Sequence, residues 1–429
     1  MKFLYSDTQD YVDPGYDFLN DRPSPGRKKY WDDRYAHELM DAPPYDGLLV
    51  SMSAVKTVPG VSGGAGRYST AEEQRFLRDG ARRFLRFDGL RFKDRMLMGD
   101  CGAFAYAGLD RPAYTPDEVV EFYADGGFTH GCSPDHIIFD FDTTNPPPSD
   151  VSDAVRDRYA ITLENAFEFR AQALRNHVQF EPVAAIQGWS PESMAQAAVS
   201  LERMGFRYLA VGGLVPLKSD AIHACLRAIR ERIKPETQLH LLGFAKADQI
   251  HEFIQYGIAS FDSTSPLIRA FKDARANYYI DSPDNSLAYY TAIRIPQAIE
   301  NPRLLQAIKQ GKLATGELLR RESEALAAIR GYDKGIVPLD KAIEVLAEYQ
   351  HYLTLAIEDS ATKRERALED AKSQISITLR DAPWKRCACA ICRQIGVEVI
   401  IFRTSNRNKR RGFHNLGVYY NHLKRTLAS

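Results

Sequence analysis

The sequence predicts an α/β fold: a TIM-type (β/α)8 barrel with a helical insertion and a carboxy-terminal zinc-binding subdomain. Short apolar runs alternate with polar, helix-compatible segments, which is typical of a parallel sheet covered by helices. Most of these runs end in aspartate, glutamine or glycine, as expected where groups from several strands meet at the carboxyl face of a barrel. Three cysteines crowded near the end of the chain indicate a metal subdomain.

The expected strands fit either an open doubly wound sheet or a closed barrel. They are residues 47–52, 96–100, 136–142, 182–188, 208–213, 240–244 and 260–263. An open sheet would concentrate its site at one switch point between strands. Here Asp100, Asp140, Gln187, Gly212 and Asp262 stand at or near the ends of separate runs, and this favours the barrel.

Four segments follow from this pattern. Residues 1–45 are rich in Asp, Pro, Gly and Tyr and are expected to be irregular. Residues 46–284 would form the catalytic barrel. Residues 285–382 lose the strand-like runs, and the helical spacing of Leu339, Ile343, Leu346 and Leu353 predicts a helical insertion. Residues 383–429 would form the zinc-binding subdomain and complete the barrel.

Composition limits the class of protein. The 429 residues include 56 basic and 56 acidic side chains, so the chain is no polycation and any nucleic-acid surface must be local. No secretory signal or membrane-spanning run is visible, and six cysteines are too few for a disulfide scaffold, so we expect a cytoplasmic enzyme that does not enter a membrane. The candidate phosphate-binding surface is a basic loop with no acid in it: Arg403, Arg407, Lys409, Arg410 and Arg411. A solvated loop is the alternative.

The cysteine cluster has the spacing of a zinc site. Cys387, Cys389 and Cys392 with His414 supply three thiolates and one imidazole, a common tetrahedral set. Four protein ligands leave no position for water, so the Zn²⁺ would be structural. Ordinary buried cysteines, or His422 in place of His414, are the alternatives.

Two aspartates carry the candidate chemistry. Asp262 and Asp100 each end an expected strand, which would bring both carboxylates to one barrel mouth. Such a pair can divide labour as in retaining glycoside chemistry, with one attacking the anomeric carbon and the other moving protons. Each aspartate alone would equally fit a helix cap or a turn.

A series of short motifs adds a resemblance. It runs Asp100-Cys-Gly-Ala-Phe104, Gln187-Gly188, Leu209-Ala-Val-Gly-Gly-Leu214, His240-Leu-Leu-Gly243, Phe261-Asp262 and the cysteine cluster with His414. In order and approximate spacing the series resembles the queuine/archaeosine tRNA-guanine transglycosylase family. That family exchanges a guanine in a nucleic acid for a 7-deazaguanine base.

The resemblance implies roles for individual residues. Asp262 matches the nucleophile that binds C1′ of the sugar, and Asp100 the acid/base. Phe104 matches the aromatic that stacks on the base, and Leu242 an apolar cover on its other face. Asp140 resembles the carboxylate that binds the amidine edge of the base, with Asp142 as a competing assignment. Gln187 and the backbone at Gly212 and Gly213 resemble the groups that bind its carbonyl.

The sequence also departs from the family pattern. Cys101-Gly102-Ala103 replaces Ser-Gly-Gly, Ala105 replaces a glutamine, and the 124 residues 263–386 separate Asp262 from Cys387 where the tRNA enzymes have a short connection. A changed insertion suggests a changed polymer, and the opening residues 2–7 and 11–16 resemble the DNA-guanine transglycosylases of 7-deazaguanine DNA-modification systems. The expected substrates are therefore DNA and a preQ0-type base, and partner proteins of such a system fit this interpretation. A tRNA-guanine transglycosylase and a non-catalytic nucleic-acid-binding subunit are the alternatives.

Overall fold

The computed structural model describes residues 1–6, 9–61, 66–244, 246–282 and 286–428. The chain forms two compact units. The barrel unit comprises Met1–Gln9 and Tyr45–Ser265, and the second unit comprises Asp10–Pro44 and Pro266–Ser429.

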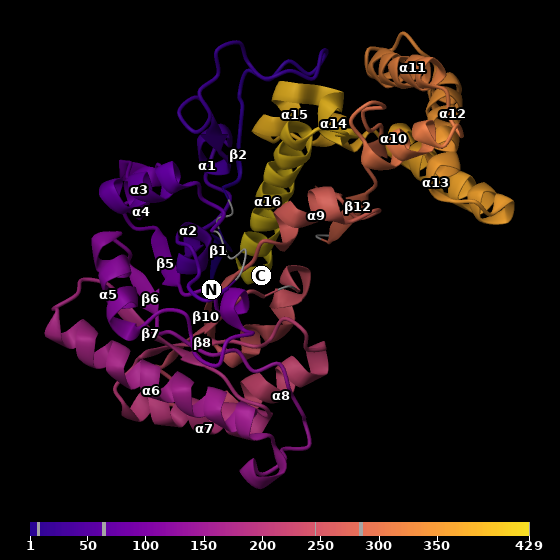
Figure 1. Ribbon diagram of the computed structural model, residues 1–429. Helices are drawn as coiled ribbons and strands as arrows, with labels where there is room; N and C mark the ends of the chain where they lie inside the picture. The colour runs from indigo at the N-terminus through magenta and orange to yellow at the C-terminus, as the bar shows by residue number, and fades with distance from the viewer. Residues whose placement is uncertain (7–8, 62–65, 245, 283–285, 429) are drawn as a thin grey trace. The chain divides into compact units, whose positions relative to one another are not determined.

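The barrel unit is a closed sheet of parallel strands (Figure 1). The strands are β1 (Lys2–Ser6), β4 (Gly47–Ser51), β5 (Met96–Asp100), β6 (His130–Cys132), β7 (Glu181–Ile186), β8 (Tyr208–Val211), β9 (Gln238–Leu241) and β10 (Ile258–Asp262). They pair in the order β1-β10-β9-β8-β7-β6-β5-β4, and β4 pairs with β1 to close the sheet. The predicted TIM-type barrel is therefore confirmed.

Helices cover the outside of this barrel, and Figure 1 shows α6, α7 and α8 lying outside the strands. The helices are α2 (Met52–Val55), α3 (Thr70–Asp79), α4 (Ala81–Phe84), α5 (Pro116–Asp125), α6 (Asp153–Arg175), α7 (Pro191–Arg203) and α8 (Ser219–Arg230). Short 3-10 helices are η1 (Leu90–Phe92), η2 (Ala103–Tyr106), η3 (Pro148–Asp150) and η4 (Ala247–Tyr256). Local sequence determines where several of these helices begin. A capping box between Thr115 and Glu118 begins α5, with Pro116 in its first turn, where the missing N–H costs nothing.

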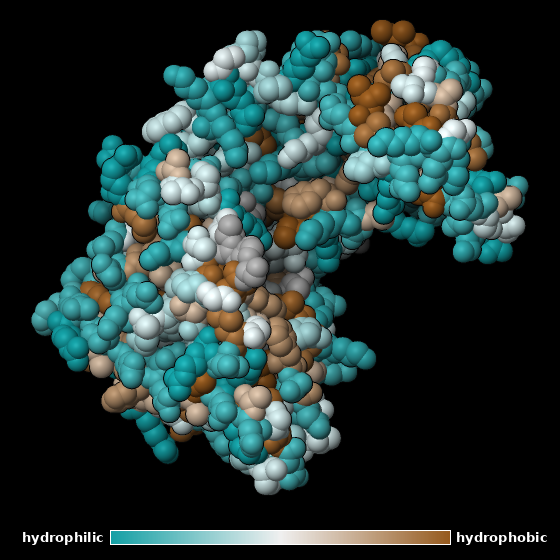
Figure 2. All heavy atoms as spheres, viewed as in Figure 1, coloured by the Kyte–Doolittle hydropathy of each residue, from teal (hydrophilic) through white to brown (hydrophobic). Residues whose placement is uncertain are grey.

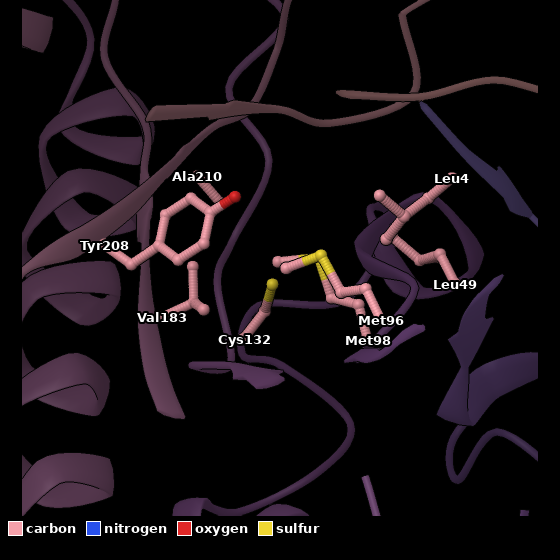
Figure 3. Packing of buried hydrophobic residues seen from close by; sticks show 8 residues of the cluster. All are labelled: Leu4, Leu49, Met96, Met98, Cys132, Val183, Tyr208 and Ala210. Atoms are coloured by element: carbon pink, nitrogen blue, oxygen red, sulfur yellow. The ribbon is translucent and has the colours of Figure 1, made fainter. Parts of the chain in front are cut away.

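The barrel interior is filled by side chains from successive strands. Figure 3 shows them directed toward one another, and the cluster comprises Leu4, Leu49, Met96, Met98, Cys132, Val183, Tyr208 and Ala210. All are less than 5% exposed, so this region is a packed core. Leu242, which is partly buried, packs against this cluster. Because successive residues of a strand face opposite sides, Ser260 and Asp262 of β10 share one face of the sheet, while Phe261 lies on the other.

One expected strand is displaced. The run 136–142 was expected as a strand, but β6 lies earlier, at His130–Cys132, and the residues that follow are irregular. They are nevertheless buried as far as Ile138. Side-chain oxygens accept hydrogen bonds from the backbone N–H groups of this segment. The N–H of His136 donates to Thr162 Oγ1 at 3.0 Å, and that of Ile138 donates to Gln187 Oε1 at 3.3 Å. Apolar residues are therefore buried here without a strand partner.

The closure of the barrel also differs from expectation. Residues 1–45 were expected to be irregular, yet β1 lies among them and pairs with both β10 and β4. The segment 383–429 was expected to complete the barrel, and it contributes no strand to it. The first strand of the chain closes the barrel instead.

The second unit is mostly helical. Its strands are β2 (Tyr11–Val12), β3 (Arg34–Tyr35), β11 (Tyr278–Asp281), β12 (Leu287–Tyr290), β13 (Ile293–Arg294) and β14 (Ile401–Phe402). Its helices are α1 (Ala36–Leu39), α9 (Ser265–Lys272, whose first residue belongs to the barrel unit), α10 (Pro302–Lys309), α11 (Thr315–Asp333), α12 (Leu339–Ile357), α13 (Ala361–Asp381), α14 (Pro383–Arg386), α15 (Ala390–Ile395), η5 (Gly396–Ile400) and α16 (Ser405–Ala428).

Helices α10 to α13 lie within the segment for which the sequence predicts helices. Helix α12 packs against both α11 and α13, with Ile343, Leu346 and Leu353 buried on the expected face. Apolar side chains remain exposed on the same block, where Figure 2 shows brown surface over α11 and α12. Ile336, between these two helices, is 74% exposed. Among the described residues, no helix is both long and apolar enough to cross a membrane.

Candidate active site

A cavity of about 670 Å³ opens at the carboxyl ends of the barrel strands. Among the described residues, three carboxylates line it: Asp100 at the end of β5, Asp262 at the end of β10, and Asp135 in the buried segment after β6. The other predicted site residues that line it are Phe104, Gln187, Gly212, Gly213 and Leu242. The barrel topology thus brings together residues far apart in the sequence, such as Ser6 and Asp262, which are 256 positions apart.

Asp262 is held by three donors. Its Oδ1 accepts from the backbone N–H of Gly243 at 2.7 Å and lies 3.1 Å from Nε2 of His240, while its Oδ2 accepts from the hydroxyl of Ser6 at 2.5 Å. The side chain is only 5% exposed, yet Asp262 lines the cavity. Hydrogen bonds of this kind stabilise the charged form of a buried carboxylate and fix its orientation. Asp262 is therefore a buried carboxylate whose orientation is set by three hydrogen bonds.

Asp100 has a different environment. Its Oδ2 accepts from Ser51 Oγ at 2.9 Å and from the N–H of Gly102 at 3.0 Å. Burial, reinforced by the negative charge of Asp262 and opposed by the Ser51 hydrogen bond, raises the pKa of Asp100 to about 6. A carboxyl with a pKa near neutrality can both give and take a proton. Gly102 has φ +79°, and a Cβ there would lie 1.9 Å from Ser53 Oγ, so this turn requires glycine.

Asp135 lines the cavity where the sequence led us to expect Asp140. Its Oδ2 accepts from Gln187 Nε2 at 2.6 Å, and both side chains are buried. Burial, together with the charge of Asp100, raises the pKa of Asp135 to about 7 against the Gln187 hydrogen bond. Asp140 and its alternative Asp142 are both exposed and do not line the cavity. Sequence reasoning missed Asp135 because it precedes the apolar run, whereas Asp140 and Asp142 stand at its end.

The glycine pair after β8 makes room for Gln187. A Cβ on Gly212 would lie 2.4 Å from Gln187 Nε2, and one on Gly213 would lie 3.3 Å from Gln187 Oε1. Gly213 also has φ +71°. The two glycines therefore let the backbone approach the amide side chain closely and leave backbone groups facing the cavity.

Aromatic side chains stand at the cavity. Phe104, which lines it, is 56% exposed, and its ring centroid lies 5.8 Å from that of Phe139, which is 49% exposed. Leu242 and Val215 add further apolar surface to the lining. A flat ring entering the cavity would therefore meet an aromatic face and aliphatic carbons. Phe139 was not anticipated from the sequence.

The departures from the family motif fall in two places. Cys101 points away from the cavity: its Sγ lies 3.5 Å from the hydroxyl of Tyr123, and burial raises the pKa of its thiol. Ala103 and Ala105 line the cavity with methyl groups. The cysteine therefore alters packing behind the site, whereas Ala105 alters the cavity itself.

The cysteine cluster lies in the second unit. The ligand atoms of Cys387, Cys389, Cys392 and His414 all lie within 4.8 Å of one another. Nδ1 of His414 is 3.5, 3.3 and 3.4 Å from the three sulfurs, in that order. Ligand bonds of about 2.3 Å to sulfur and about 2.0 Å to nitrogen would place tetrahedral partners roughly 3.5 Å apart, so the residues fit a tetrahedral ion.

Neighbouring groups orient this cluster. Nε2 of His414 lies 2.7 Å from the carbonyl of Tyr279, which fixes the proton on Nε2 and leaves Nδ1 for a metal. The ring of Tyr278 stacks on the imidazole at 4.1 Å. His422 lies outside the cluster and its Nδ1 is 3.8 Å from Asp281, so His414 is the histidine of the set.

The prediction of an exposed basic loop that binds phosphate is wrong, because most of these residues lie in a helix and are buried. Ser405–Ala428 is the helix α16, and Arg407, Arg410 and Arg411 are 0% exposed. Arg407 pairs with Asp21 and Glu398, and Arg411 donates to the carbonyl groups of Ala270, Val399 and Ile401. Burial lowers the pKa of Arg411 to about 9.

The two other cations of this group are also engaged in the second unit. Arg403 pairs with Asp21 and Glu322 at 2.5 Å each, and its side chain is 5% exposed. Nζ of Lys409 lies 3.5 Å from Asp10 and 5.5 Å from the ring centroid of Tyr11. These cations hold the second unit together, and none presents an open surface to phosphate.

Comparison with known proteins agrees with this geometry. The family model described as Queuine tRNA-ribosyltransferase matches residues 78–282, which include Asp100, Asp135, Gln187 and Asp262. A DNA-guanine transglycosylase of Salmonella montevideo is 38% identical over 429 residues, covering 100% of this chain and 98% of the relative. Because that similarity extends over the whole chain, the protein belongs to the queuine tRNA-ribosyltransferase family, whose members are base-exchanging glycosyltransferases.

Proposed function

We propose that this enzyme exchanges guanine in DNA for a 7-deazaguanine base of the preQ0 type, through a covalent bond between Asp262 and the sugar. The observation that carries the proposal is the pairing, in one cavity, of the triply hydrogen-bonded Asp262 with Asp100, whose pKa is raised to about 6. The relative's name supports DNA as the polymer. The cavity is also large enough for a purine-sized base, within the usual range of about 300–1,000 Å³ for ligand sites.

The exchange has two balanced halves. A carboxylate oxygen of Asp262 attacks C1′, the C1′–N9 bond breaks, and the departing guanine takes a proton from Asp100. In the second half the ionised Asp100 takes the proton from N9 of the incoming base. N9 then attacks C1′, and the C1′–O bond breaks to release the carboxylate. Two displacements at one carbon retain its configuration.

The remaining lining residues would bind the base. Asp135, in place of Asp140, would accept hydrogen bonds from its amidine edge, and Gln187 with the backbone at Gly212 and Gly213 would contact its carbonyl. Phe104 would stack on one face, opposite Leu242. Arg67 is the cationic side chain among the described lining residues, and it is exposed, so it would contact a phosphate beside the target nucleotide.

The metal has a structural role in this proposal. Zn²⁺ on Cys387, Cys389, Cys392 and His414 would join α15 and the chain before it to α16, and four protein ligands would leave no position for a reacting water. No step of the exchange involves it.

The test measures exchange of labelled guanine, together with covalent capture. Wild-type protein, Asp262→Asn and the control Asp157→Asn, which changes an exposed carboxylate on α6, are incubated with duplex DNA, single-stranded DNA or tRNA. We expect guanine exchange in DNA and a protein–DNA adduct on a denaturing gel, both lost only in Asp262→Asn. Full activity of Asp262→Asn contradicts the assignment of the nucleophile.

A second candidate function is exchange in tRNA, which the description of the matching family model favours. It predicts label in tRNA and none in DNA. Nucleoside mass spectrometry on cells that carry the gene with its native neighbours separates the two, since the product is a modified deoxynucleoside in one case and a ribonucleoside in the other. If protein that holds its metal yields neither product, the chain is a non-catalytic binding subunit.

A further inference from the structure

A chain of buried polar side chains lies behind Asp262 inside the barrel. His240 of β9 has Nε2 3.1 Å from Asp262 Oδ1 and Nδ1 2.6 Å from Ser260 Oγ. Ser260 Oγ lies 2.5 Å from the hydroxyl of Tyr208 on β8. His240 and Ser260 are 0% exposed and Tyr208 is 4% exposed. We propose that His240 is a positioning residue, held by Ser260 and Tyr208 as a neutral imidazole with its proton on Nε2, which orients Asp262 for attack through Oδ2.

The direction of each hydrogen bond in this chain follows from Asp262, the final acceptor. An ionised carboxylate only accepts, so Nε2 of His240 must carry the proton. In a neutral imidazole Nδ1 is then an acceptor, and the Ser260 hydroxyl donates to it. That hydroxyl oxygen in turn accepts from Tyr208. The order of donation is therefore Tyr208, Ser260, His240, Asp262, and each hydroxyl hydrogen has one acceptor.

The surroundings of this chain are largely apolar and buried. Tyr208 belongs to the apolar cluster that fills the barrel, and Figure 3 shows its ring packed among the side chains of that cluster. Besides Asp262, the titratable groups near this chain include Cys132 of the same apolar cluster and His130 of β6, whose ring lies 5.6 Å from that of Tyr208. Burial is the main cause that lowers the pKa of His130 to about 4. A neutral His240 matters for the reaction, because an imidazolium would neutralise much of the charge of the attacking carboxylate.

The same contacts distinguish the two oxygens of Asp262. Oδ1 accepts from Gly243 and His240, and a carboxylate oxygen has two lone-pair sites, so both of its sites are used. Within the described chain, Oδ2 accepts from the hydroxyl of Ser6. Oδ2 therefore keeps the lone pair that forms the bond to C1′. The ring of His240 sets the rotation of the carboxylate that directs this lone pair into the cavity.

This inference rests on the proposed role of Asp262, and the kinetic test separates the two. The variants are His240→Leu, which removes both ring bonds, His240→Gln, which keeps an N–H donor, and Tyr208→Phe, which removes one hydroxyl. His223→Leu on α8 is the control, because that ring bonds Tyr256 and does not line the cavity. We expect kcat to fall roughly 10- to 100-fold in His240→Leu, with the KM for both substrates within about twofold. His240→Gln should recover most of kcat, and Tyr208→Phe should lose about threefold.

A direct readout comes from nitrogen NMR of histidine-labelled protein, with the His240 signals identified by their absence in His240→Gln. At pH 7 we expect a protonated Nε2 and an unprotonated Nδ1, and in Ser260→Ala a mixture of tautomers.

An imidazolium at pH 7, a proton on Nδ1 alone, or an unchanged kcat in His240→Leu would overturn the inference. If Asp262→Asn is active, the proposed function fails. If Asp262→Asn is inactive and His240→Leu is as active as wild type, only this inference fails. Should His240→Leu not fold, Tyr208→Phe and the wild-type spectrum still decide it.

Discussion

Replacing Asp135 by asparagine should make the barrel more stable, and increasingly so as pH rises. The amide keeps an oxygen that accepts from Gln187 Nε2, the 2.6 Å bond that Asp135 makes now. It removes the buried charge. In the folded protein, burial and the charge of Asp100 raise the pKa of Asp135 from the ordinary 3.8 to about 7. A raised carboxyl pKa means that folding favours the protonated form.

The sign and size of the effect follow by linkage. Below the unfolded pKa both states are protonated and the carboxyl costs nothing. As pH rises toward 7 the unfolded chain releases its proton and the folded chain does not, so the free energy of unfolding falls by about 1.4 kcal/mol per pH unit. Above about 7 the loss is constant. Relative to wild type, Asp135→Asn should therefore gain about 2–3 kcal/mol between pH 5 and pH 8.

Urea unfolding measured by fluorescence can isolate the barrel unit. Trp189 lies in that unit and is 6% exposed, whereas Trp31 and Trp384 lie in the second unit and can be replaced by phenylalanine in all proteins compared. The control is Asp140→Asn, whose carboxylate is exposed and should give curves parallel to wild type at both pH values. A stability difference between Asp135→Asn and wild type that is the same at pH 5 and pH 8 would refute the reasoning. In exchange assays Asp135→Asn should raise the KM for the incoming base.

Three further changes have expected outcomes. Phe104→Ala should weaken binding of the free base by about 1–3 kcal/mol, measured by calorimetry, since it removes the exposed ring at the cavity. Arg67→Gln should lower the slope of the DNA affinity against salt concentration by about one, and an unchanged slope would place the phosphate elsewhere. Cys389→Ser should remove one ligand of the Cys387-Cys389-Cys392-His414 set and lower the amount of zinc bound per chain, measured by mass spectrometry. The control Cys225→Ser, which changes a buried cysteine of the barrel unit outside that set, should leave the bound zinc unchanged.

The features that the sequence predicted well are those set by local pattern. The cysteine spacing and His414 fix the metal cluster within a short stretch, and the polar ends of the expected strands identified the barrel. The strand β1 was missed because five residues, Lys2–Ser6, lie in a segment whose overall composition is that of a loop. Composition averaged over 45 residues hides a strand of that length.

The features that the sequence predicted poorly depend on partners far along the chain. Arg407 pairs with Asp21, 386 positions away, so the absence of acids between 403 and 411 gave no indication that its charge is compensated. Asp135 lines the cavity from an irregular segment in which the N–H of Ile138 donates to the side chain of Gln187 instead of to a strand neighbour. Hydropathy patterns reveal which residues are buried, and not which groups satisfy their backbone.

In the proposed reaction, hydrogen bonding would give the three carboxylates that line the described part of the cavity different tasks. Asp262 accepts from two side chains and a backbone N–H, which fix the orientation that the proposed attack requires. Asp100 accepts from one hydroxyl and one N–H, and its pKa of about 6 lets it cycle between acid and base. Asp135 accepts from Gln187, and its pKa of about 7 means that binding a base rich in N–H donors would draw out its proton. Because like charges so close together resist full ionisation, the donors supplied by β1, β4, β9 and the loops after the strands decide which carboxylate is charged first.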